Sequence, residues 1–160
     1  MSFVKTCGKL VLAGLVTLAL SVPALAQEVT TKYFSLDLPD GWTQPQPVQE
    51  GNGALMAIFQ SKKDGSAVTV TVVANPISAK DVATQTAANM KQGGVTVSDP
   101  VEKDGVYECT FSQGQGKGVS YFASNGKEFS VTTVLGPNTD TGAELLKKFK
   151  PADAKLFPKF

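Results

Sequence analysis

The side chains that this sequence lacks exclude most familiar catalytic sites. Neither histidine nor arginine occurs among the 160 residues. This excludes three kinds of site: a catalytic triad with a histidine base, a metal site with histidine ligands, and a phosphate or carboxylate site with an arginine. Chemistry in this chain would have to come from cysteine, from serine with lysine, or from paired carboxylates.

Cysteine chemistry depends on two residues, Cys7 and Cys109. Cys7 falls in a predicted signal peptide, so Cys109 would have no partner for a disulfide, a Cys-x-x-Cys redox pair or a zinc site. Cys109 shares one face of a predicted strand with Tyr107 and Phe111, and no histidine is available to lower its pKa. We therefore predict a buried thiol without a redox or nucleophilic role.

A glycine-rich segment, Gln-Gly-Gln-Gly-Lys-Gly at residues 113–118, resembles a phosphate-binding loop. It lacks the Walker spacing, and it precedes a predicted strand, whereas phosphate loops need the N-terminus of a helix. No nucleotide or other cofactor is therefore predicted. We expect a flexible hairpin connection, in which Gln113, Gly114, Gly116 and Lys117 are candidate contacts to a partner.

Carboxylates offer two further possibilities, a calcium site and a hydrolase. Asp37, Asp40 and Asp64 do not have the spacing of an EF-hand, and turn carboxylates in solvent are the simpler interpretation, so no metal site is predicted. A hydrolase with two facing acids or a serine–lysine pair stays as a lesser alternative. A chain of this length has little room for the cleft that such an enzyme needs.

The first 26 residues have the pattern of a secretory signal peptide. Lys5 and Lys9 precede an apolar run at 10–20, which is shorter than the roughly 20 residues of a membrane span. Small residues at 24–26 predict cleavage after Ala26. We expect a periplasmic protein that meets the membrane only through this cleaved segment, with one domain at 27–160.

The charge balance of that domain argues against a nucleic-acid partner. Loss of Lys5 and Lys9 reduces the 15 basic residues to 13, against 14 acidic ones. Neutralising a phosphate backbone requires a concentrated basic surface.

Hydrophobic periodicity predicts the elements that must position these residues. Strands are expected near 34–38, 54–60, 67–74, 95–97, 107–111, 119–123 and 129–135, and helices at 78–92 and 141–150. The segment 43–53 is expected to lack regular structure, and the tail to residue 160 to pack loosely. Asn125-Gly126 predicts a type I′ hairpin.

Two helices are predicted from capping patterns. Ser78 and Asp81 open the first, whose apolar stripe is Val82, Ala83, Ala87 and Met90. Thr141 and Glu144 open the second, which Pro151 would stop. No strand–helix–strand alternation repeats along the chain. The fold class is therefore α+β, an antiparallel sheet with helices packed on it.

This element order, opened by YFSLDLPDGW at residues 33–42, resembles the PsbP/Mog-like α/β/α sandwich superfamily. Within it, the DcrB-type bacterial periplasmic proteins are the expected relatives. The resemblance implies an accessory or binding role and no shared catalytic residues. The metal-binding histidines of some PsbP proteins have no counterpart here.

The function predicted from these observations is an exported, non-catalytic accessory protein that recognises an unidentified periplasmic or envelope protein. Trp42 and Tyr121 are the aromatic candidates for that contact, although burial of each in the core is the stronger expectation. The glycine-rich loop, the loop at 43–53 or an exposed sheet face are the other candidates. The alternative is a carrier of a small apolar ligand or lipid, held between the sheet and the alanine-rich first helix.

Overall fold

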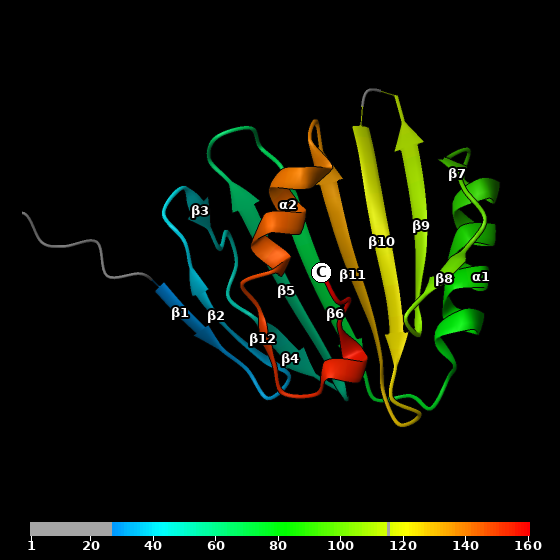
Figure 1. Cartoon of the computed structure of the whole chain (residues 1–160), viewed down its shortest axis with the longest axis horizontal. Helices are drawn as coiled ribbons and strands as arrows, with labels where there is room; N and C mark the ends of the chain where they lie inside the picture. Colours follow the sequence, from blue (N-terminus) through cyan, green and yellow to red (C-terminus); the bar gives the residue numbers. More distant parts are fainter. Residues whose placement is uncertain (1–26, 115) are drawn as a thin grey trace, which may run out of the picture.

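The computed structural model describes residues 27–114 and 116–160, and its largest element is an antiparallel sheet with the strand order β3-β5-β6-β11-β10-β9-β7 (Figure 1). Strand β4 pairs with β5, and β8 pairs with β9. The bounds are β3 (Trp42–Thr43), β4 (Gln49–Gly51), β5 (Ala54–Ser61), β6 (Ala67–Val73), β7 (Thr96–Val97), β8 (Val101–Lys103), β9 (Val106–Gln113), β10 (Gly116–Ser124) and β11 (Phe129–Gly136). The predicted signal peptide at 1–26 lies outside the described residues.

A second, smaller sheet has the order β1-β2-β12, with β1 (Gln27–Thr30), β2 (Phe34–Leu38) and β12 (Lys150–Pro151). The strand predicted at 34–38 is present, and it belongs to this second antiparallel sheet, which the sequence did not predict. Strand β2 buries Phe34, Leu36 and Leu38 against the main sheet. Its partners could not be predicted, since β12 is two residues long and exists only through its pairing with Phe34 and Ser35.

Two helices pack on opposite faces of the main sheet, α1 (Ala79–Gln92) and α2 (Thr139–Leu146). Helix α1 buries Ala83 and Ala87 in one cluster with Cys109 and Phe122. Helix α2 contacts Val134 on β11. Phe122, which lies beneath α1, is paired with Val131 on β11, so these two side chains share a face. Val134 follows Val131 by three residues and therefore points to the opposite face of the sheet. Figure 1 shows α2 in front of the sheet and α1 beside β9. The predicted α+β class is confirmed.

The start of α1 follows the sequence prediction, and the bounds of α2 do not. Ser78 caps α1, with its Oγ accepting a hydrogen bond from the Asp81 N–H at 3.1 Å. Helix α2 begins two residues before the predicted capping box, because Asn138 accepts from the Asp140 N–H. It ends at Leu146, so Pro151 does not stop it.

The core between the two sheets is rich in aromatic rings. Phe34 packs on Phe149 and Phe157, with ring centroids 4.8 and 5.9 Å apart, and Phe59 contacts Phe149 at 5.7 Å. The prediction of a loosely packed tail was wrong. Leu156, in the short 3₁₀ helix η1 (Ala154–Leu156), is only 1% exposed, and it accepts a hydrogen bond from the Ser130 hydroxyl.

Two tight connections correct the turn predictions, and a third was not predicted. The segment 43–53 contains β4 and a two-residue turn, Asn52-Gly53, with φ of 52° and 75°. Asp104-Gly105 makes the same left-handed turn between β8 and β9, with φ of 52° and 82°. Asn125-Gly126 does not form the predicted type I′ turn. It lies in a four-residue loop, and the Asn125 side chain accepts from the N–H groups of Lys127 and Glu128.

Candidate binding surfaces

Helix α1 covers only part of its face of the main sheet, since it packs against β7, β9 and β10. The same face of β5, β6 and β11 forms what we call the open face, and its residues Phe129 and Val131 pack at one margin against the cluster beneath α1. The strand registers align its twelve outward residues in four cross-strand rows: Ala54, Val73, Phe129; Met56, Thr71, Val131; Ile58, Thr69, Thr133; and Gln60, Ala67, Leu135. Eight of these twelve described positions are apolar, three are threonine and one is glutamine.

The open face is unusual in composition for a sheet surface in contact with water. Met56 is 37% exposed and Leu135 44% exposed, and none of the twelve positions carries a charge. Three strands spaced about 4.8 Å apart, each about 24 Å long, make a patch of roughly 350 Å². Apolar patches of about 300–600 Å² are the largest on typical monomers and are often functional.

Charged side chains gather at the two ends of the open face. Lys62 and Lys63 lie in the turn between β5 and β6, and Lys127 lies in the loop between β10 and β11. Asp64 and Glu128, in the same two connections, accept hydrogen bonds from Thr141 and Tyr33 on the opposite face. A depression of about 420 Å³ adjoins the margin near β4 and reaches Met56 and Thr71 on the face itself. The surface therefore has an apolar centre and a polar rim, which is the usual arrangement of a protein interface.

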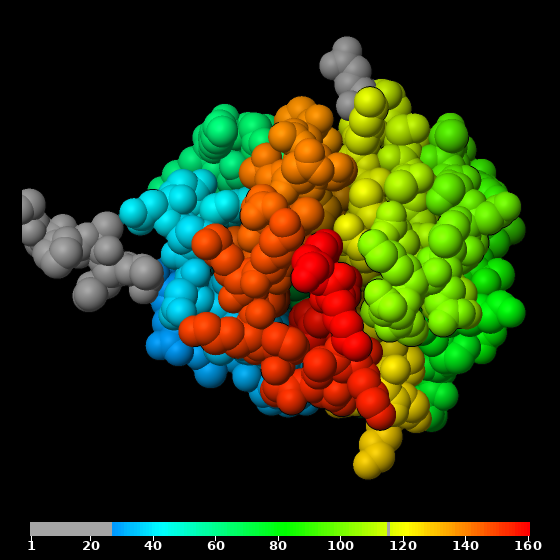
Figure 2. Space-filling model, viewed as in Figure 1, coloured from blue at the N-terminus to red at the C-terminus, as the bar shows by residue number. Residues whose placement is uncertain are grey.

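A second candidate is a cavity of about 190 Å³ on the other face of the sheet, lined by Lys103, Val106, Glu108, Tyr121, Pro158, Lys159 and Phe160. The ring of Phe160 meets that of Tyr121 edge to face, with centroids 5.6 Å apart. In Figure 2 the chain after η1, drawn in red, lies between α2 and the yellow-green strands, with a seam on the side of those strands.

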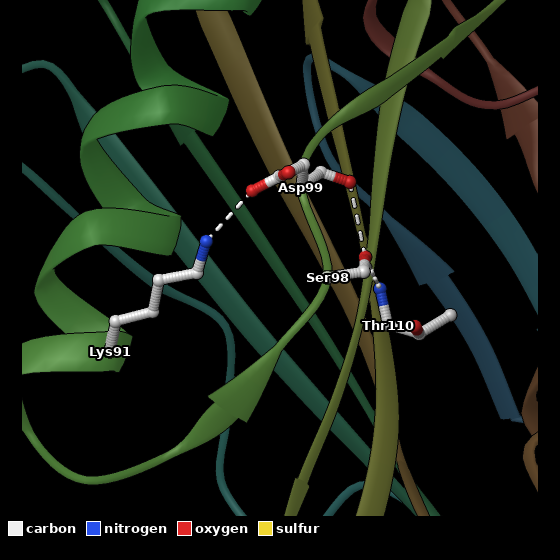
Figure 3. A network of polar contacts seen from close by, with 4 residues as sticks. All are labelled: Lys91, Ser98, Asp99 and Thr110. Atoms are coloured by element: carbon white, nitrogen blue, oxygen red, sulfur yellow. Dashed lines mark hydrogen bonds and ion pairs between the residues drawn. The ribbon is translucent and has the colours of Figure 1, made fainter.

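The Lys91–Asp99 pair bears on the serine–lysine hydrolase alternative (Figure 3). Lys91 Nζ lies 2.8 Å from Asp99 Oδ1, and this bond lowers the pKa of the Asp99 carboxyl. The Ser98 hydroxyl donates to the Asp99 carbonyl at 3.1 Å and accepts from the Thr110 N–H at 3.0 Å. The lysine is therefore held by a carboxylate, and the group ties the end of α1 to the link between β7 and β8.

Cys109 is buried on a strand face, as the sequence predicted, and it lies beneath α1. It is 1% exposed, and burial raises the pKa of its thiol. In the parts of the chain that the structure describes, no three or more histidine, cysteine or acidic residues are placed to hold a metal ion. Those parts also contain no helix of the length and apolarity needed to cross a membrane.

Comparison with solved structures identifies the architecture. Cyanobacterial PsbP (CyanoP) from Synechocystis sp. PCC 6803, solved in solution, matches with a TM-score of 0.54 and 12% sequence identity, over 92% of this chain and 98% of that one. The fold is that of PsbP. The PsbP-like fold predicted from residues 33–42 and the element order is thus confirmed, and the narrower DcrB-type assignment stays a prediction.

The other comparisons add no argument about the PsbP-like fold. A crystal structure from Bacteroides thetaiotaomicron VPI-5482 matches with a TM-score of 0.43 and 10% identity, over 81% of this chain and 50% of that one. A scan of protein-family models found no match, and a search of curated protein sequences found none either.

The PsbP-like fold does not bring the predicted contact residues onto one surface. Gln113, Gly114, Gly116 and Lys117 stay together in the β9–β10 hairpin, where Gln113 and Lys117 are exposed. The two predicted aromatic contact residues, Tyr121 and Trp42, lie away from this turn and away from each other.

Tyr121 sits four residues further along β10, where it lines the 190 Å³ cavity and is half-buried. Trp42 is on β3, with β5, β6 and β11 between it and β10. It is half-buried against the core, which agrees with its alternative role as a core residue.

Sequence reasoning mentioned a sheet face but did not identify the open face. A signal was present, because Ala54 to Ser61 has apolar residues at both odd and even positions. Strands of this composition are typical of sheets that are covered on both faces. Here the inner residues Leu55, Ala57 and Phe59 are buried, whereas Met56 is exposed.

Proposed function

We propose that this protein is an exported, non-catalytic accessory protein that binds a partner protein in the periplasm through the open face. The observation that carries the proposal is the charge-free, largely apolar surface over β5, β6 and β11, beside the part of the sheet that α1 covers. The accessory role implied by the resemblance to PsbP-type proteins supports it.

The chemistry of the open face indicates what its partner must present. A charged group placed over the centre would lose its hydration without an opposite charge to pair with. The partner surface should therefore be apolar at its centre, with small polar groups able to meet Thr69, Thr71 and Thr133. Charged groups of the partner would meet the turns at the two ends of the face, where they mainly affect the association rate.

The lipid-carrier alternative has less support. It requires space between α1 and the sheet, and the small stripe of α1 is instead in direct contact with the sheet. Ala83 is fully buried and Ala87 is 4% exposed, in one cluster with Cys109 and Phe122.

The test is recovery of a periplasmic partner by the parent protein and by variants of the open face. Met56→Lys and Leu135→Lys place charge on it at exposed positions, so folding should be retained. Val101→Lys is the matched control, because Val101 is 64% exposed and lies on β8, away from the open face. We expect the parent and the control to recover the same stoichiometric protein, and the two open-face variants to lose it.

A benzophenone cross-linker at position 56 or 135, with position 101 as the control, gives a second readout that needs no change of charge. Recovery of the same partner by all three lysine variants, or equal cross-linking at positions 56 and 101, would contradict the proposal.

A further inference from the structure

The 190 Å³ cavity described above has a chemistry of its own, independent of the open face. Two of its lining residues, Glu108 on β9 and Tyr121 on β10, are directly paired across the strands, and Thr132 on β11 is paired with Tyr121 behind the lining. The remaining wall comes from Lys103 and from the segment with Lys159 and Phe160. Charged, phenolic and aromatic groups therefore meet at one place on a face that is otherwise apolar core.

The polar groups of this cavity have no partners within the described chain. Lys103, Lys159 and Glu108 belong to none of the three ion pairs there. Counting side chains alone, the cavity has two ammonium groups and one carboxylate. The phenol of Tyr121 also makes no hydrogen bond with any described residue and is free to donate one.

A buried hydroxyl next to the cavity is also unsatisfied. Thr132 is completely buried, and its Oγ1 has no hydrogen-bond partner among the described residues. Directly paired residues have Cβ atoms about 5 Å apart, so Thr132 adjoins Tyr121 behind the lining. Buried polar groups without partners are few in folded proteins, and each one calls for an explanation such as a bound molecule.

The volume limits the size of that molecule. A cavity of about 190 Å³ is smaller than the ~300–1,000 Å³ of pockets for drug-sized ligands. It equals the liquid volume of about six water molecules. A lipid chain does not fit, whereas a single ring with one substituent does.

We infer that this cavity binds a small aromatic carboxylate. The carboxylate group pairs with Lys103 and Lys159 and accepts the Tyr121 hydroxyl, and the ring packs against the edge-to-face pair of Tyr121 and Phe160. Glu108 repels the carboxylate and so orients it toward the two lysines. A ligand with a hydroxyl or amino substituent could donate a hydrogen bond to Glu108.

The experiment is a titration of the purified protein at pH 7, followed by amide chemical shifts in ¹H–¹⁵N NMR spectra. Benzoate is the probe, acetate tests the need for the ring, and benzylamine keeps the ring but reverses the charge. We expect benzoate to saturate with a Kd below about 1 mM, and to shift the amides of residues 106–108, 121 and 158–160. Acetate should bind more weakly, and benzylamine should not saturate.

Variants test the two lysines, and the same spectra show directly whether each variant is folded. Lys103→Gln and Lys159→Gln should each weaken benzoate binding about fivefold, as expected for a partly exposed ion pair. Lys63→Gln, in a distant turn, is the matched control and should have no effect. Three results would each overturn the inference. They are equal binding of benzylamine and benzoate, unchanged benzoate affinity in both lysine variants, and chemical-shift changes confined to residues outside the cavity. These outcomes are independent of whether the open face binds a protein.

Discussion

Gly142 of α2 touches Val134 of β11 so closely that a Cβ on the glycine would overlap the Cγ1 methyl of the valine. The same Cβ would lie 3.1 Å from Cγ2 of Val68. Both valines are buried, at 1% and 0% exposure, and neither can move aside. The helix rests directly on the sheet at this position.

Gly142→Ala should therefore destabilise the protein, although alanine favours a helix by about 1 kcal/mol over glycine. Overpacking typically costs about 1–3 kcal/mol, so we expect a net loss of up to about 2 kcal/mol. Urea unfolding followed by circular dichroism measures it. In a Val134→Ala background the methyl group has space, and the same change should become neutral or stabilising. If Gly142→Ala lowered the free energy of unfolding equally in the parent and in the Val134→Ala variant, the close contact between residues 142 and 134 would be contradicted.

Asp64 predicts a pH dependence of stability in the acid range. Its pKa is lowered to about 2, first by the Ser66 N–H that donates to Oδ1 and then by the Thr141 hydroxyl that donates to Oδ2. A folded-state pKa below the ordinary 3.8 contributes stability that is complete above about pH 4 and is lost as the pH falls toward 2. Asp64→Asn should lower the melting temperature at pH 5, and the difference from the parent should vanish near pH 2.

The control for this experiment is Asp40→Asn, in another turn, whose carboxylate makes no hydrogen bond with any described residue. Its difference from the parent should be small at pH 5, because the substitution removes no hydrogen bond to a described residue. A constant difference for Asp64→Asn between pH 5 and pH 2 would count against the hydrogen bonds at the Asp64 carboxylate.

Two Asn-Gly pairs that look alike in the sequence should respond differently to glycine. Asn52 has a φ of 52°, so Asn52→Gly should be neutral or slightly stabilising, by at most about 0.5 kcal/mol. Asn125 accepts from two backbone N–H groups and donates to Asp153 at 2.9 Å. Asn125→Gly should cost about 2 kcal/mol, measured by urea unfolding. Similar values for the two variants would contradict the assigned turns.

The Cys109 thiol should react slowly in the native protein, since it is buried and its pKa is raised by burial. Thr110, the next residue on β9, is exposed on the opposite face and supplies the matched control. In a Cys7→Ser background, iodoacetamide should label the Cys109→Ala, Thr110→Cys variant at least about a hundredfold faster than the parent. Comparable rates measured by mass spectrometry would show that α1 does not protect the thiol.

Local patterns were sufficient for the long elements of this fold. Strand β6 was predicted because Val68, Val70 and Val72 alternate with smaller or polar residues, and helix α1 because Ser78 and Asp81 cap it. Such patterns act within a few residues of each other, so a sequence displays them directly.

The parts that prediction missed depend on contacts between distant residues. Strand β12 is two residues long and is held by β2, more than 110 positions earlier in the chain. The loop at Asn125 takes its shape partly from Asp153. The apolar positions on both sides of β5 indicate that both of its faces are apolar, but which strands α1 covers depends on the tertiary arrangement.

The aromatic cluster of Phe34, Phe59, Phe149 and Phe157 has a consequence for the order of events during biosynthesis. A chain that has been synthesised only as far as α2 lacks two of these four rings and the strand that completes the small sheet. The aromatic core therefore cannot be complete until residue 157 has left the ribosome or the export channel. A protein destined for translocation, as the sequence predicts for this one, benefits from that delay, because a narrow pore admits only a polypeptide that has not yet folded.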